Sequence, residues 1–153
     1  MVKLKFDVVH LMYLEACVDK YFRYYCQASQ PRYCYTKEER AEIQNKSNQL
    51  GTLCKMLPNG EIKKEHINLL IDTVEYNKKT ITEYLAHPEH IFDMSQTIFN
   101  IEFIINYLKK LNELFDLLKW GVLFKISNND HWFYMHEWIF EYIINEQILM
   151  NNI

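Results

Sequence analysis

Apolar residues recur along most of the chain at the three- and four-residue spacing that is typical of amphipathic helices. The first such segment runs from about Leu4 to Gln27. Its polar residues form only a narrow stripe, and aliphatic and aromatic side chains fill most of the remaining circumference. A helix that is apolar on so many sides is packed from several directions. We therefore expect a buried, aromatic-rich first helix inside the fold.

The second helix is expected to start at Thr36, because Thr36-Lys-Glu-Glu39 has the form of a capping box. Its apolar stripe is thin and includes Leu50 and Leu53, which places this helix on the outside. Pro58-Asn-Gly60 is a strong turn signal. A third helix is then predicted from about Glu61 to Ala86.

A long helical pattern follows from Pro88 to Trp120. At full length it would span roughly 50 Å, which exceeds the width of a domain of this size. We therefore expect it to bend or break near Leu108 to Asn112. Gly121 is typical of a residue that ends a helix.

Ser127-Asn-Asn-Asp130 predicts a turn that ends in a helix cap, and the last helix is expected from about His131 to Met150. Glycine and proline number only three each, which argues against a sandwich or barrel with many tight turns. The pattern contains no repeat and no linker. The predicted fold is a single all-α domain over residues 1–153, a bundle of five to seven helices.

Charge is distributed unevenly along the chain. The net charge is −3, so nucleic acid is not expected as a direct partner. Every Lys and Arg lies at or before Lys125, whereas residues 126–153 carry only acidic charges among many aromatic residues. An acidic, aromatic last helix suits a basic amphipathic partner. The alternative is that its aromatic residues are core and its carboxylates form the solvated face.

No apolar secretory segment is visible near Met1, and no stretch approaches the ~18–20 apolar residues that a membrane span needs. We therefore expect an intracellular protein, cytoplasmic in a host cell, without a membrane span. The cysteines are then expected to be free thiols, because the intracellular environment is reducing. Their spacings match no C-x-x-C pair, which argues against a structural zinc site. The cysteines are Cys17, Cys26, Cys34 and Cys54.

Catalytic motifs are missing from the sequence. The three glycines lie far apart, so no phosphate-binding loop exists, and no serine has the Gly-x-Ser-x-Gly setting of a nucleophile elbow. His87-Pro-Glu-His90 is interrupted by a proline, and His131 and His136 diverge by roughly 140° around a helix. We expect no enzyme, no cofactor and no metal. The alternative from another class is a metal-dependent helical-bundle enzyme whose histidines converge from different helices.

Two stretches resemble motifs of the Bcl-two apoptosis regulators. Val18-Asp-Lys-Tyr21-Phe-Arg-Tyr24-Tyr25 is similar to their first-helix motif, in which apolar residues and tyrosines recur on a long buried helix. Trp138-Ile139-Phe140-Glu141 is similar to the start of their second homology motif, near the end of the domain. Together the two stretches cover about 12 residues.

The resemblance implies an all-α fold with a surface groove that binds the death-promoting helix of a partner. Short divergent members occur in large DNA viruses, and the high Asn, Ile, Lys and Tyr content suits an AT-rich viral or phage genome. Family members also carry an Asn-Trp-Gly-Arg motif, whose Arg pairs with an Asp of the ligand. Asp116-Leu-Leu-Lys-Trp120-Gly121 resembles that motif, but Val122 stands in place of the Arg.

These features favour a non-catalytic helical interaction protein of viral or phage origin that sequesters a host protein. The expected ligand is an amphipathic helix in a groove between the second and the last helix. An alternative in the same class is a phage-encoded inhibitor of a bacterial defence nucleoprotein complex, of the anti-CRISPR type, with Lys63, Lys64, Lys78 and Lys79 as a contact face. The identity of the partner and the oligomeric state are left open. The predicted partner-binding residues are Leu50, Leu53, Trp132, Trp138, Ile139, Glu141 and Tyr142.

Overall fold

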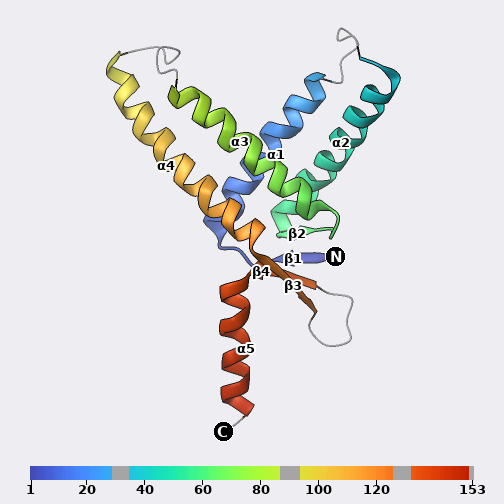
Figure 1. Ribbon diagram of the computed structural model, residues 1–153, viewed down its shortest axis with the longest axis vertical. Coiled ribbons are helices and arrows are strands. Elements are labelled where there is room, and N and C mark those ends of the chain that lie inside the picture. The colour runs from blue at the N-terminus through green and yellow to red at the C-terminus, as the bar shows by residue number, and fades with distance from the viewer. Residues whose placement is uncertain (29–34, 87–93, 126–131, 152–153) are drawn as a thin grey trace.

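The computed structural model describes residues 1–28, 35–86, 94–125 and 132–151, and most of them lie in helices (Figure 1). The expected small helical domain is confirmed. A four-stranded sheet, which the sequence pattern did not predict, is added to it. Among the described residues the α-helices are α1 (Val8–Ala28), α2 (Lys37–Met56), α3 (His66–Ala86), α4 (Met94–Lys119) and α5 (Glu137–Asn151).

The helix starts follow ordinary capping chemistry. Thr36 caps α2 as predicted, because its hydroxyl accepts the backbone N–H of Glu39 at 3.2 Å. Helix α1 begins later than the expected Leu4: its cap is Asp7, whose Oδ1 accepts the backbone N–H of His10 at 2.8 Å. The predicted Pro58-Asn-Gly60 turn is present as a 3₁₀ turn over Leu57–Asn59, and Gly60 closes it with a φ of 68°.

The core lies where α1 meets the other three helices of the bundle. Helix α1 packs against α2, α3 and α4, and α3 also packs along α4. In Figure 1 these four helices spread upward from the sheet as two pairs. Leucines at helical spacing supply most of the interior, and the largest fully buried side chains on the helices are Leu14, Val18, Leu50, Leu53, Leu70, Leu111, Leu114 and Leu118.

Helix α1 is central, but one side of it faces solvent. Tyr21 is buried, and Tyr13, Phe22 and Tyr25 are partly buried against the core. Val8, Met12 and Tyr24 remain exposed. The aromatic residues of α1 therefore divide between the core and its rim.

The sheet has the strand order β2-β1-β4-β3. Strand β1 pairs antiparallel with β2 and parallel with β4, so that Val2 lies opposite Trp132, and β4 forms an antiparallel hairpin with β3. The sheet closes the lower end of the helical bundle (Figure 1). The strands are β1 (Val2–Leu4), β2 (Glu61–Ile62), β3 (Gly121–Lys125) and β4 (Trp132–His136).

The sheet corrects three predicted helix boundaries. Leu4 and residues 61–62, expected at the starts of the first and third helices, belong to the strands β1 and β2. The last helix does not begin at about residue 131, because residues 132–136 form β4 and α5 starts at Glu137. The expected break near residues 108–112 is also absent, since α4 is one helix of 26 residues. Pro31, Pro88 and the predicted turn at residues 127–130 lie outside the described residues.

Gly121 was predicted to end a helix, but the structure shows that a close contact with a tyrosine ring requires glycine there. It is the first residue of β3, and the ring of Tyr134 lies so close that a Cβ on Gly121 would collide with it. The Tyr134 hydroxyl donates a hydrogen bond to the carbonyl of Leu118 at the end of α4. This joint fixes the β3–β4 hairpin, from which α5 continues, against the bundle. None of the helices in the described ranges is long and apolar enough to cross a membrane.

Candidate binding surface

Helix α5 extends away from the bundle on the far side of the sheet (Figure 1). Its main contacts are with β3 and β4. The Glu137 backbone N–H donates to the Trp120 carbonyl at 3.0 Å, and the ring of Phe140 packs on Phe124 with centroids 5.2 Å apart. The base of α5 is therefore anchored, while most of its described side chains from Glu137 onward face solvent.

Aromatic side chains lie open on this helix. Trp138 is 68% exposed and Tyr142 is 55% exposed, and their rings stack with centroids 6.2 Å apart and planes 19° from parallel. Tyr142 and Trp138 are one helical turn apart, so they share a face. Ile144 is also exposed. Such a cluster of large apolar side chains is typical of a surface that another molecule covers.

The charges on α5 are all of one sign. Its described charged residues are Glu137, Glu141 and Glu146, all exposed, and no Lys or Arg follows Lys125 in the sequence. The Tyr142 hydroxyl donates to Glu146 Oε1 at 2.9 Å, and this hydrogen bond to the carboxylate raises the pKa of Tyr142. The α5 surface is therefore both aromatic and acidic.

A pocket of about 410 Å³ lies at the base of α5, where this helix meets the ends of α1 and α4. Its walls are mostly apolar, with Leu117 from α4 and Ile139 from α5 among them. Trp138 contributes to the wall as well, so the pocket is continuous with the exposed face of α5. The remaining lining residues are His10, Glu113, Asp116 and His136.

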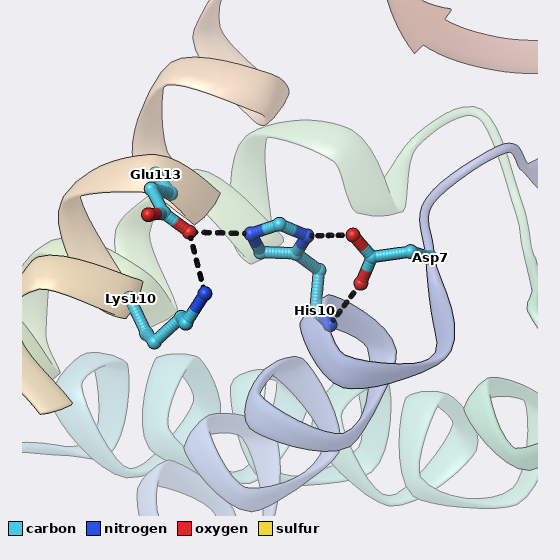
Figure 2. Close-up of polar contacts among 4 residues, drawn as sticks. All are labelled: Asp7, His10, Lys110 and Glu113. Carbon is cyan, nitrogen blue, oxygen red and sulfur yellow. Dashed lines mark hydrogen bonds and ion pairs between the residues drawn. The ribbon is translucent and has the colours of Figure 1, made fainter.

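His10 joins two helices at the edge of this pocket (Figure 2). Its Nδ1 lies 2.7 Å from Oδ2 of Asp7, and its Nε2 lies 2.8 Å from Oε2 of Glu113 on α4. Lys110 Nζ donates to the same Glu113 oxygen at 3.2 Å. An imidazole whose two nitrogens both face carboxylates donates to both of them only when it carries both protons.

The carboxylates of this cluster are stabilised in their charged forms. The pKa of Asp7 is lowered, first by the backbone N–H of His10 and then, against the opposing effect of burial, by the His10 side chain. The pKa of Glu113 is lowered by its hydrogen bonds to His10 and Lys110. Both carboxylates are largely exposed, so their ion pairs contribute little to stability. The cluster fastens the first turn of α1 to α4.

The cluster is not arranged for nucleophilic catalysis. Both nitrogens of His10 are engaged by carboxylates, and none of the described Ser, Thr or Cys side chains forms a hydrogen bond with it. His136 is engaged as well, because its Nδ1 accepts the backbone N–H of Trp138 at 3.1 Å. Asp116 differs from both: its carboxylate lines the pocket and forms no hydrogen bond or ion pair with any described residue.

The structure separates the residues that were predicted to bind a partner. Leu50 and Leu53 are fully buried in the core, so they do not line a surface groove. Helices α2 and α5 lie on opposite sides of the sheet, and the predicted groove between them is wrong (Figure 1). Trp132 lies on β4, half-buried, with Lys64 Nζ 3.3 Å from its ring centroid. Trp138, Ile139, Glu141 and Tyr142 do lie together, on the first turns of α5.

The sequence did not predict that His10, Glu113, Asp116 and His136 would line a common pocket. The pocket forms only because α1 packs near α4 and the hairpin brings α5 to the same place, over more than one hundred residues of sequence. One local signal was available. Asp7 immediately precedes an apolar helical pattern, and aspartate at such a position is a candidate helix cap.

No group of three or more His, Cys, Asp or Glu side chains within the described residues is placed to hold a metal ion. His87, His90, His131 and Cys34 lie outside those residues. Cys17 and Cys54 are free thiols, and burial raises the pKa of Cys17 to about 11. Of the four lysines considered as a contact face, Lys64 covers Trp132 and Lys78 lies over the ring of Phe115.

Compared with known protein families, with curated proteins and with solved structures, the chain matches none. The resemblance to Bcl-two regulators stays a prediction from the sequence. Of its two stretches, the first lies on α1 and the second forms the first turn of α5. Trp120 and Gly121, which resemble part of the Asn-Trp-Gly-Arg motif, lie between the end of α4 and the start of β3.

Proposed function

We propose that the protein is a non-catalytic interaction protein that binds the helix of a partner protein along α5. The observation that supports this proposal is the exposure of Trp138 and Tyr142 on a helix that extends away from the body. Stacked aromatic side chains provide large contact areas at a low cost in side-chain entropy, and they are common at the centres of binding surfaces.

The energetics of α5 support the same proposal. It has 15 residues, and isolated helices of that length are marginally stable in water. Nine of its residues are apolar, distributed around the helix in runs of three. A helix with apolar residues on several sides is normally covered on several sides. The described part of the chain covers α5 mainly at its base, so a partner would bury what remains exposed.

The partner proposed from the sequence is a host protein, and its binding element is an amphipathic helix. A helix laid beside α5 would place its apolar stripe on Trp138 and Tyr142 and its polar residues toward solvent. The viral or phage origin and the link to apoptosis rest on the sequence alone and are retained as predictions.

The test uses a synthetic 18-residue peptide with a leucine stripe at helical spacing and lysine and glutamine elsewhere. A peptide of the same composition in scrambled order is the control. Binding is measured by fluorescence in a W120F/W132F background, in which Trp138 is the single tryptophan. We expect the amphipathic peptide to shift Trp138 emission to shorter wavelength and the scrambled peptide to leave it unchanged.

Substitution locates the binding surface. In the W120F/W132F background, Trp138→Ala removes the last tryptophan. Binding to the variants is therefore measured by the fluorescence anisotropy of a labelled peptide. Trp138→Ala combined with Tyr142→Ala is expected to weaken binding about 10-fold or more, as loss of a hot spot does. Phe103→Ala is the matched control, because Phe103 is 62% exposed on α4 and does not contribute to the pocket at the base of α5. Equal binding of the scrambled peptide, or full affinity of the double variant, would contradict the proposal.

A further inference from the structure

The pocket at the base of α5 combines an aromatic wall with a carboxylate that has no partner among the described residues. We propose that this pocket binds an arginine side chain of the partner helix, with its guanidinium group on Asp116 and Glu113. The inference rests on the proposed function, since the pocket and the exposed α5 face share Trp138. It adds the chemical identity of the side chain that fixes the partner in place.

The composition of the pocket suits a long side chain with a charged end. Its volume of about 410 Å³ is large enough for one extended side chain. Leu117 and Ile139 offer apolar contacts for a methylene stem. Trp138 adds an aromatic ring to the lining, and the electron-rich face of such a ring attracts a cation. The guanidinium of arginine is planar and weakly hydrated, so it suits a site of this kind better than the ammonium of lysine.

The charges select a cation. Glu113 and Asp116 are three residues apart on α4, so both carboxylates lie on one face of that helix. Glu113 already accepts a hydrogen bond from Lys110 and faces His10, whereas the Asp116 carboxylate is engaged by none of the described residues. An arginine with five N–H donors can bridge two neighbouring carboxylates. An anionic side chain would be repelled by both.

The carboxylates of α5 disfavour a second copy of the chain as the molecule that binds this helix. Symmetric pairing of two α5 helices would bring Glu137, Glu141 and Glu146 of one copy near those of the other. Like charges at such an interface oppose association. A basic partner instead gains from every carboxylate on α5 as well as from Asp116, so charge complementarity points to a basic amphipathic helix.

The experiment uses the full chain and two probe peptides that differ at one position. Both have a leucine stripe and a glutamine-rich polar face, and one carries a single arginine where the other carries glutamine. We expect the arginine peptide to bind about 5-fold more tightly or better, within the range of a partly exposed charged hydrogen bond. Asp116→Asn should remove most of that difference and leave the glutamine peptide unaffected. Glu75→Gln, which removes an exposed carboxylate on α3 outside the pocket, should change neither affinity.

A charge swap provides the second arm. Asp116→Lys is expected to disfavour the arginine peptide and to favour a third peptide with glutamate at that position. Circular dichroism establishes that each variant is folded, and sedimentation measures self-association.

If both peptides bind equally well, or if Asp116→Asn weakens both equally, the arginine site is overturned, although the α5 surface stands. If Trp138→Ala with Tyr142→Ala changes no affinity, the proposed function itself fails. Dimerisation that needs Trp138 would overturn the basic partner in favour of a second copy.

Discussion

Helices α4 and α5 are both rich in apolar residues, yet α4 has one fully buried leucine face whereas α5 exposes much of its described apolar surface. On α4 the residues Leu111, Leu114 and Leu118 recur at intervals of three and four, lie on one face and are fully buried. On α5 the apolar residues occur in consecutive runs, 138–140 and 142–144 among them, and therefore point in several directions. The sheet covers only one of these directions at the base of α5. The number of apolar residues thus does not by itself decide how much of a helix is buried. Their spacing decides whether they share one face that a single neighbouring element can cover.

The largest expected effect comes from shortening a buried leucine of α4. Leu114→Ala removes a fully buried side chain and leaves a cavity, so the free energy of unfolding should fall by about 2–5 kcal/mol. Trp138→Ala on α5 removes a larger but exposed side chain, and its effect on stability should stay within about 0.5 kcal/mol. Urea denaturation followed by circular dichroism measures both. Equal losses in the two variants would show that α5 is part of the core.

A medium effect on stability is expected where the Tyr134 ring packs on Gly121, between the end of α4 and the hairpin that carries α5. Gly121→Ala should lower the free energy of unfolding by about 1–3 kcal/mol, because its Cβ would collide with the Tyr134 ring that holds the hairpin to α4. Gly51→Ala is the matched control. Gly51 lies inside α2, where alanine is favoured by about 0.5–1 kcal/mol, and the nearest atom to its added Cβ is Cε2 of Phe22 at 3.3 Å. Equal stability of the Gly121→Ala and Gly51→Ala variants would show that the Tyr134 ring leaves room for a side chain at position 121.

The smallest expected effect is a pH dependence that belongs to the bundle. His66, at the start of α3, is buried, and burial is the main reason why its pKa is lowered. The folded protein therefore favours neutral His66, while the unfolded chain binds a proton near the ordinary pKa of 6.5. The resulting stability is fully present above that pH and is lost as the pH falls through the lowered folded pKa.

His66→Asn tests this assignment, because an asparagine oxygen can still accept the Lys63 backbone N–H that now reaches His66 Nδ1 at 3.3 Å. The measurement is the slope of unfolding free energy against pH between about 7 and 5, the region around the ordinary histidine pKa. The variant should show a flatter slope than the original chain, whatever its absolute stability. At lower pH, Asp7 and Glu113 add a further loss of stability, since their lowered pKa values favour the charged forms in the fold. An unchanged slope would assign the pH dependence to another group.

The sequence predicted the features that depend on neighbouring residues. The Thr36 cap, the turn at Gly60 and the helical character of the segments are all encoded within a few positions of each other. The strands were missed because β1 and β2 contain only three and two residues, too few to show a period of two. Strand β4 is a continuous apolar and aromatic run, which a buried helix also produces.

The candidate site was predicted in part for the same reason. Trp138, Ile139, Glu141 and Tyr142 are neighbours along one helix, and their aromatic and acidic character is visible without any tertiary contact. Leu50 and Leu53 were misplaced because a thin apolar stripe on an outer helix indicates which face is apolar but not what covers it. His10 and Glu113 meet across 103 residues, and only the packing of α1 near α4 brings them together.

The parallel pairing of β1 with β4 has a consequence for the order of events during synthesis. Val2 and Trp132 are about 130 residues apart, so β1 leaves the ribosome long before its neighbour exists. The contacts among α1, α2, α3 and α4 span shorter loops and close at a smaller entropic penalty. The bundle can thus fold first, and the sheet forms only after β4 has been synthesised. The arm formed by α5 acquires its fixed base only after β4 has been synthesised, which delays exposure of an oriented docking surface until the four helices of the bundle are in place.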